Sequence, residues 1–400
     1  MGKAPKSDGY PRWNKKTRVW EQWLDLGRDE DGKRLRKRVT GKTRNAVKEK
    51  ITELRTQIKK GINVRAKPQT IADLARTYLD TINVRPRTHA SYRYVIERFI
   101  VPNIGTLSAR KMAASDVRKL LVKLKSEPLQ RQGPMKDEAT PKLLSGNTIA
   151  LVRTVLYQVM ELAIADDLRD DNPVSRAPSI TRDETPTRAL SDEQAHALLV
   201  ALKGDRLEMA IRLLLGLGLR RGECVALQLD DINLEAGTLR IDATMGYVSK
   251  ELGNLYGPPK TTSSKRTLSL PSRLKAALSW YLRQRELEQK AMNWPDSPWL
   301  FRSIRNGGKL NDNTLYLAFK RAAAKAGLVG FSPHSLRHST ATFLHAEGVP
   351  LVEIASVLGH SNLDELARYL HTLPGEQSVA LGKLDDRIDR TSPEWRSVGA

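Results

Sequence analysis

The sequence has one cysteine, Cys224, so no disulfide can form within the chain. This scarcity fits a reducing compartment. No uninterrupted apolar run approaches the ~18 residues of a membrane span, and the first residues lack the apolar segment of a secretory signal. We therefore expect a cytoplasmic chain with no membrane partner.

Motifs for nucleotide or metal cofactors are also missing. Residues 41–43 read Gly-Lys-Thr, but the earlier glycine and the apolar strand of a phosphate-binding loop are absent. Five histidines outside the motifs discussed below have no metal-ligand spacing with one another or with carboxylates. They are His89, His196, His338, His345 and His371. We expect neither a cofactor nor a metal.

Acidic residues are too few to balance the basic ones. The 45 Asp and Glu stand against 67 Lys and Arg, which gives a formal net charge of +22. Residues 1–67 hold 21 basic and 8 acidic residues, a net charge of +13 in about a sixth of the chain. So basic a chain is expected to bind a polyanion, and its 40% hydrophobic residues are enough for folded domains. Its 400 residues suggest two to three of them.

Residues 1–67 predict a small sheet backed by one helix. Strand patterns surround Trp13 and cover residues 18–26 and 35–40, with a turn at 28–32 that ends in Asp-Gly. A helical pattern follows and ends at Gly61. Its apolar residues are Val47, Ile51, Leu54 and Ile58. The less specific alternative is a basic domain that serves only solubility.

The rest of the chain predicts a helical domain, a linker and a larger mixed domain. Residues 61–69 resemble a linker, and residues 68–176 contain four helical patterns, the first capped by Thr70. Residues 177–189, rich in Pro, Thr and charge, form a second expected linker. Residues 190–374 open on a capping box, Ser191 with Gln194. Short strands are expected there at about 238–242, 246–249 and 266–270, with helices elsewhere, and residues 375–400 form a tail.

The reactive side chains gather near the end of the sequence. If His334 opens a helix, its i, i+3 spacing to Arg337 puts an imidazole and a guanidinium on one face, where both can contact one anion. Tyr369 follows His360 by nine residues. A tyrosine hydroxyl has a pKa near ~10 and needs basic groups and cations around it to act as a nucleophile. The sequence supplies such groups.

Two upstream segments complete a set of motifs. Residues 217–223 read Leu-Gly-Leu-Arg-Arg-Gly-Glu, and Lys260 stands in the turn before the strand at 266–270. In order and spacing, these motifs resemble the tyrosine recombinases of the phage-integrase type. Each motif alone is weak evidence for the family, because such short patterns occur by chance in many helices. Their residues could then be ordinary ion-paired or core residues. Five in order are specific, although Lys265 on the same hairpin competes with Lys260 for its assignment.

The resemblance implies a fold and a set of roles. The fold class is multidomain α+β: an arm-binding domain (1–67), a four-helix core-binding domain (68–176) and a mainly helical catalytic domain with a small antiparallel sheet. Arg220 and Arg337 would clamp a phosphate, Lys260, His334 and His360 would transfer protons or orient groups, Glu223 would support the arginine, and Tyr369 would be the nucleophile. Asp364 and Glu365 depart from the family pattern. Candidate DNA-binding residues are Arg36, Lys37, Arg38, Arg87, Arg93 and Lys119.

The implied partners are double-stranded DNA, at core and arm attachment sites, and three other copies in a homo-tetramer. A host DNA-bending protein and an excision directionality factor are further expected partners. Two other classes compete with this interpretation. A type IB topoisomerase uses the same constellation as a monomer, and a DNA-binding regulator would keep the basic surfaces without catalysis. The basic front domain and the complete reactive set favour the recombinase.

Overall fold

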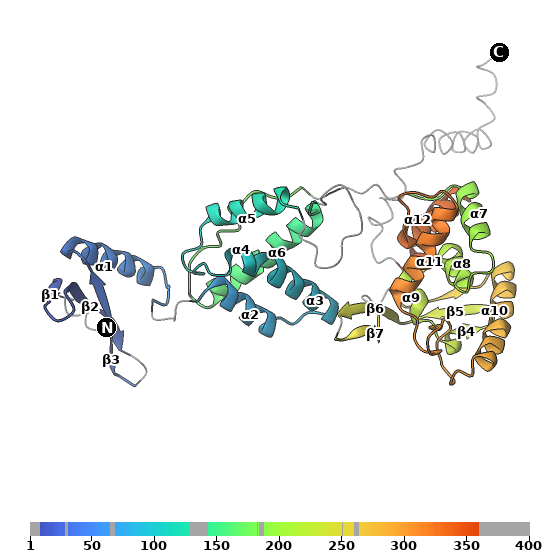
Figure 1. The fold of residues 1–400 in the computed structure, drawn as a ribbon, viewed down its shortest axis with the longest axis horizontal. Helices are drawn as coiled ribbons and strands as arrows, with labels where there is room; N and C mark the ends of the chain where they lie inside the picture. The colour runs from blue at the N-terminus through green and yellow to red at the C-terminus, as the bar shows by residue number, and fades with distance from the viewer. Residues whose placement is uncertain are drawn as a thin grey trace, which may run out of the picture. The chain divides into compact units, whose positions relative to one another are not determined.

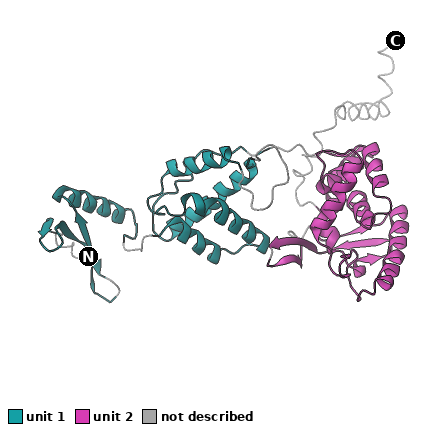
Figure 2. Cartoon of the chain, viewed as in Figure 1, with its two compact units in different colours: residues 1–184 teal, residues 185–400 magenta. Residues whose placement is uncertain are grey.

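We describe the chain from a computed structural model. It describes residues 9–28, 31–64, 69–128, 143–181, 183, 188–249, 251–259 and 264–359. The chain divides into two compact units, residues 1–184 and 185–400 (Figure 2). This boundary lies inside the range expected to be a linker.

The first unit begins with a three-stranded antiparallel sheet, in the order β1-β2-β3. Its strands are β1 (Arg12–Asn14), β2 (Val19–Arg28) and β3 (Arg34–Gly41), and the helix α1 (Arg44–Lys59) follows. The Thr43 hydroxyl caps α1 by accepting a hydrogen bond from the backbone N–H of Ala46, 3.2 Å away. The buried core between sheet and helix consists of Leu24, Val39, Val47 and Ile51. The structure thus has the small sheet and helix that the sequence predicts.

A helical layer makes up the rest of the first unit (Figure 1). Its helices are α2 (Ile71–Thr81), α3 (Pro86–Val95), the π-helical turn η1 (Ile96–Ile100), α4 (Val101–Ile104), α5 (Ala114–Ser126) and α6 (Gly146–Ala165). Thr70 caps α2 as predicted. The second helix begins at Pro86, because proline fits the first turn of a helix.

Helix α6 is the centre of this layer. Among the described helices, it is the one that is long and apolar enough, by length and composition, to cross a membrane. Of the 18-residue stretch that meets this criterion, 39% is buried. Arg153 and Glu161 interrupt its apolar sequence. Seven of its residues, Ile149, Val152, Val155, Leu156, Val159, Met160 and Ala163, are buried in the core of the layer. These contacts are those of a core helix.

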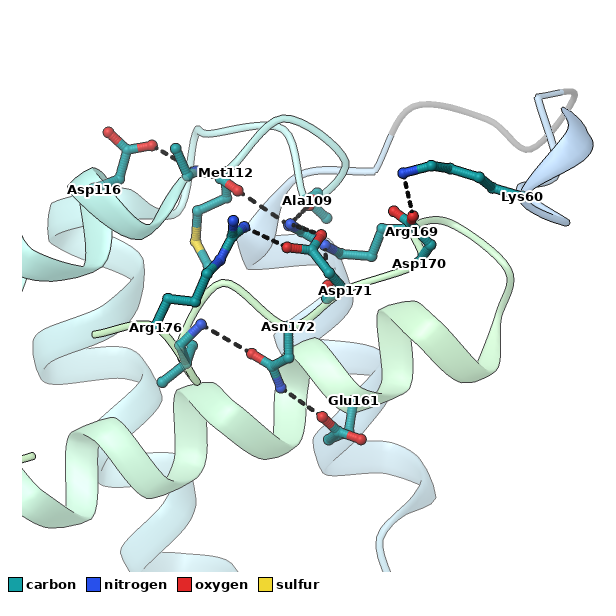
Figure 3. A network of polar contacts seen from close by, with 12 residues as sticks. Lys60, Ala109, Met112, Asp116, Glu161, Arg169, Asp170, Asp171, Asn172 and Arg176 are labelled. Carbon is teal, nitrogen blue, oxygen red and sulfur yellow. Dashed lines mark hydrogen bonds and ion pairs between the residues drawn. The ribbon is translucent and has the colours of Figure 1, made fainter. Parts of the chain in front are cut away.

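Residues 61–64, expected to belong to a linker, are anchored to the helical layer. The backbone N–H of Asn63 donates to the carbonyl of Asp167 at 2.7 Å, and its carbonyl accepts from Arg110 at 2.8 Å. Lys60 pairs with Asp170 at 2.7 Å (Figure 3). In the same polar network, the buried Arg169 donates to backbone carbonyls of the helical layer. The front sheet is therefore attached to the helical layer by specific contacts at this point.

The second unit is mainly helical, with two small antiparallel sheets. Its helices are α7 (Asp192–Ala201), α8 (Glu208–Leu217), α9 (Arg221–Ala226), η2 (Leu229–Asp231), α10 (Ser272–Ala291), α11 (Asp312–Lys325), α12 (Pro333–Ala346) and α13 (Leu351–Leu358). One sheet has the order β4-β5-β8, and the other is a β6-β7 hairpin. The strands are β4 (Ile232–Asn233), β5 (Thr238–Ile241), β6 (Thr244–Ser249), β7 (Gly253–Gly257) and β8 (Arg266–Ser269).

The core of this unit brings the motif-bearing elements together. Leu213, Leu214 and Leu217 of α8, Leu336 of α12 and Leu268 of β8 belong to one buried cluster. The predicted capping box of α7 is present: Ser191 and Gln194 exchange hydrogen bonds of 3.0 and 3.2 Å. The sequence analysis missed strands β4 and β7. As a result, it assigned one sheet where the structure has a sheet and a separate hairpin.

Candidate active site

Helix α12 presents the first two candidate residues. Pro333 occupies its first turn and Ser332 precedes it as the N-cap, so His334 lies in the first turn and Arg337 one turn later. His334 is exposed, whereas Arg337 is only 1% exposed. Buried hydroxyls on the following turns hold the helix: Thr340 donates to the carbonyl of Leu215 at 2.7 Å, and Ser339 accepts from the backbone N–H of Leu190 at 2.8 Å. Arg337 is thus presented from a fixed helix.

Two backbone carbonyls orient the Arg337 guanidinium. Its Nη1 donates to the carbonyl of Gly218 at 2.8 Å, and its Nη2 donates to the carbonyl of Leu358. Gly218 ends α8 and Leu358 ends α13, so Arg337 joins the C-terminal ends of two helices.

Arg220 approaches the same place from the α8–α9 connection. It is the N-cap of α9, and its side chain is 36% exposed. Its Nη1 lies 2.8 Å from Glu223 Oε1, and its Nη2 donates to the carbonyl of Gly359 at 3.3 Å. Arg220 and Arg337 therefore contact consecutive carbonyls, those of Gly359 and Leu358. The structure brings together the two arginines that the sequence pattern singled out.

Glu223 is the carboxylate beneath these arginines. It is 2% exposed and also accepts from Arg266 Nη2 at 3.0 Å and from the backbone N–H of Arg220 at 2.9 Å. Burial alone would raise the pKa of Glu223, but the charge and hydrogen bond of Arg266, with the hydrogen bonds from Arg220, outweigh it and lower the pKa. Glu223 therefore stays charged and holds Arg220 in a fixed geometry.

The electrostatics of the cluster also act on His334. Desolvation of its ring lowers its pKa from the ordinary value, and the positive charges of Arg337 and Arg220 lower it further. Its ring lies 4.8 Å from that of His338 in an edge-on arrangement. At neutral pH, His334 is therefore a neutral imidazole, which can accept a proton or donate a hydrogen bond.

Gly218 is the backbone position that allows this convergence. Its φ of +62° lies in the left-handed region, and a Cβ there would come 2.4 Å from Leu358 Cδ2. We expect Gly218→Ala to lower the free energy of unfolding by about 2–4 kcal/mol through strain and overpacking. Gly204→Ala is the matched control, since its φ is +80° with no atom within 4 Å of the added Cβ, and it should cost only about 1 kcal/mol. Urea unfolding of the two variants tests this, and equal losses would contradict the close contact.

Three of the predicted catalytic residues, Lys260, His360 and Tyr369, lie outside the described residues, as does the tail from 375 to 400. Lys260 stands in sequence between β7, which ends at Gly257, and β8, which begins at Arg266. His360 directly follows Gly359 in sequence, the residue whose carbonyl contacts Arg220. The positions of these residues in the sequence stay the basis of their assignment.

The candidate DNA-binding residues of the first unit do not share one face. Arg36 and Arg38 are exposed on β3, but Lys37 between them is half-buried on the opposite side, where its Nζ donates to the carbonyl of Val64. Successive residues of a strand point to opposite sides, so three in a row cannot act together. Arg87, Arg93 and Lys119 of the helical layer are exposed.

Arg266, which contacts Glu223, was not among the residues predicted from the sequence. It lies in the strand predicted at 266–270, but a strand pattern does not indicate that its side chain turns toward α9. Among the described residues, no group of three or more His, Cys, Asp or Glu side chains could hold a metal ion. The described part of the site is thus a cluster of arginines around one carboxylate, with a neutral histidine beside it.

Comparison with known proteins adds independent evidence. The model of the Phage integrase family matches residues 188–376, which include every candidate catalytic residue. A XerC-like tyrosine recombinase of Caldanaerobacter subterraneus subsp. tengcongensis is 29% identical over 91% of this chain and 95% of its own length. An integrase of Streptomyces ambofaciens is 28% identical over 89% of this chain and 90% of its own.

Solved structures show the same fold. The Tn1549 transposon integrase in complex with a circular intermediate DNA superposes with a TM-score of 0.64, at 21% identity over 79% of this chain and 99% of that one. A lambda integrase tetramer bound to a Holliday junction gives a TM-score of 0.52, at 16% identity over 88% of this chain and 91% of that one. The arrangement of helices and small antiparallel sheets described above is therefore shared with these proteins.

Proposed function

We propose that the chain is a tyrosine recombinase of the phage integrase family, whose model matches residues 188–376, and that it integrates or excises a phage or other mobile element by cutting and rejoining DNA at specific sites. The observation that carries this proposal is the convergence of Arg220 and Arg337 on consecutive carbonyls, those of Gly359 and Leu358. Two guanidinium groups fixed at one place suit the two non-bridging oxygens of a phosphodiester.

In the proposed reaction, Tyr369 attacks a scissile phosphorus atom. The bond from phosphorus to the 5′ oxygen breaks, Lys260 protonates that oxygen, and a 3′-phosphotyrosyl ester remains. Arg220 and Arg337 stabilise the negative charge that grows on the non-bridging oxygens. His334 and His360 orient groups or carry the tyrosine proton, a role that suits the neutral imidazole of His334. The new ester is comparable in energy to the bond broken, so religation needs neither ATP nor a metal.

The domain roles form part of the proposal. Residues 1–67 would bind arm sites, residues 68–176 and 190–374 would bind and cut the core site, the linker 177–189 would let them close on the duplex, and the tail 375–400 would dock on a neighbouring copy. Recombination joins two duplexes, which favours a homo-tetramer on DNA in the cytoplasm. The tetramer of lambda integrase on a Holliday junction supports this assembly. A host DNA-bending protein and a directionality factor complete the proposed set of partners.

A nicked suicide substrate separates this proposal from its alternatives. The full chain should form a covalent adduct with a core-site duplex in EDTA and then transfer that strand to a second duplex. If a monomer forms the adduct and rejoins the cut strand only within the same duplex, the chain would be a type IB topoisomerase. Binding without an adduct would indicate a regulator, and strict dependence on Mg²⁺ would contradict the metal-free mechanism.

Adjacent residues of β3 allow a sharp test of the arm-binding role. Arg36 faces solvent and Lys37 faces the opposite side. Each phosphate contact contributes about −0.9 to the slope of log affinity against log salt. Arg36→Gln should therefore make that slope shallower by about 0.9 on DNA that flanks the crossover site, while Lys37→Gln leaves it unchanged. Titration of the full chain at several salt concentrations measures both slopes, and equal effects would contradict binding through the exposed face.

A further inference from the structure

Arg266 connects three segments of the candidate active site. Its side chain is 7% exposed and uses a different nitrogen for each contact. Nη2 donates to Glu223 Oε2 at 3.0 Å, Nη1 to the carbonyl of Ser264 at 3.0 Å, and Nε to the carbonyl of Val357 at 2.7 Å. The first contact reaches α9, and the last reaches the final turn of α13. One buried side chain on β8 thus touches the elements that hold Arg220 and the carbonyls of residues 358 and 359.

The charge balance of this cluster gives Arg266 a specific task. Glu223 lies between two guanidinium groups, and its two oxygens divide between them: Oε1 accepts from Arg220 and Oε2 from Arg266. Oε2 also accepts the backbone N–H of Arg220. Arg266 therefore fixes the orientation of the carboxylate that in turn orients Arg220. Without it, one carboxylate oxygen would lose its charged partner inside a buried site, which favours rotation or protonation of Glu223.

From this geometry we infer that Arg266 is a positioning residue of the cleavage reaction, which acts on the phosphate through Glu223 and Arg220 and on α13 through the carbonyl of Val357. The inference rests on the proposed function. Arginine is needed because a planar guanidinium can direct three hydrogen bonds in fixed, divergent directions, whereas lysine carries its protons on one nitrogen. Lysine would keep the charge beside Glu223 but not the whole geometry.

The test compares Arg266→Gln and Arg266→Lys in the full chain. We expect Arg266→Gln to lower the single-turnover rate of adduct formation on a nicked duplex by about a hundredfold, with the dissociation constant for that duplex nearly unchanged. Arg266→Lys should recover part of the rate. Arg240→Gln is the matched control, because Arg240 lies on the neighbouring strand β5 and pairs with Asp231 at 3.1 Å rather than with Glu223. It should cleave at the wild-type rate.

The pH profile separates positioning from a merely structural role. Among the described residues, the charged groups around Glu223 are Arg220 at the start of α9 and Arg266 on β8, and the buried thiol of Cys224 lies next to it in sequence. The end of α13 contributes the carbonyl of Val357, which accepts from Arg266. Since burial raises the pKa of Glu223 and Arg266 opposes it, Arg266→Gln should raise that pKa. The loss of activity on acidification should then begin at a higher pH in Arg266→Gln, but not in Arg266→Lys or Arg240→Gln.

The outcomes are separable. If wild type forms no adduct, the proposed function fails. Two results would overturn the inference when wild type is active and the Arg266→Gln variant is folded. One is a cleavage rate of the variant within about threefold of the wild-type rate, and the other is a loss of activity on acidification that begins at the same pH as in wild type. Should Arg266→Gln not fold, Arg266→Lys decides the question: a rate at least about tenfold lower at unchanged DNA affinity supports positioning, and a wild-type rate overturns it.

Discussion

Arg337→Ala should lower the rate of DNA cleavage by about a thousandfold or more while the chain stays folded and binds its core site. The guanidinium is oriented by the carbonyls of Gly218 and Leu358, so it is organised before the substrate arrives. Preorganised charge of this kind acts mainly on the transition state, and loss of one such donor costs about 10²–10³ in rate. A charged donor facing a phosphate should be at the upper end.

Arg302→Ala controls for the loss of a buried arginine. Arg302 is 2% exposed in the same unit and also donates to a backbone carbonyl, that of Arg285, at 2.6 Å. Both variants should melt at lower temperature than wild type, but only Arg337→Ala should lose cleavage when assayed well below its melting temperature. Rates of adduct formation and thermal melting curves give the two readouts. Comparable cleavage losses in the two variants would show that Arg337 acts through stability alone.

Tyr369→Phe should abolish the covalent adduct altogether and leave binding to core DNA almost unchanged. The substitution removes only the oxygen atom that would attack the scissile phosphorus. Tyr281→Phe is the matched control in the same unit, where the hydroxyl donates to the carbonyl of Leu300 at 3.3 Å. Gel separation of the adduct, beside a binding titration for each variant, measures both effects. An adduct that survives in Tyr369→Phe would mean that another residue attacks.

Local signals in the sequence were enough to predict much of the fold. The hydroxyl caps at Thr70 and Ser191 gave the starts of two helices, because capping depends on residues three apart. On α11, the buried residues Leu315, Phe319, Ala322 and Ala323 lie at the spacing typical of one helix face. Strand β7 was missed because Gly253, Asn254 and Gly257 resemble a turn. Its pairing with β6 depends on contacts across the hairpin rather than on its own composition.

The site was predictable as a set of residues but not as a network. Motif order selected Arg220, Glu223 and Arg337, and the structure brings them together through Gly218, Leu358 and Gly359. The acceptors at these three residues are backbone carbonyls. A pattern of side chains in the sequence does not indicate which carbonyl an arginine will contact. The same limit applies to Arg266, two of whose three acceptors lie 43 and 91 residues away in sequence. Lys37 was grouped with Arg36 on charge alone, although strand alternation separates them.

The most direct measurement of the central claim is to locate the protein–DNA bond. The full-length wild-type chain is incubated with a nicked core-site duplex in EDTA, digested with protease and nuclease, and analysed by mass spectrometry. We expect one modified peptide, with the nucleotide attached through its 3′ phosphate to the Tyr369 oxygen. Attachment to another residue, a 5′-phosphate linkage, or cleaved DNA without any adduct would contradict it.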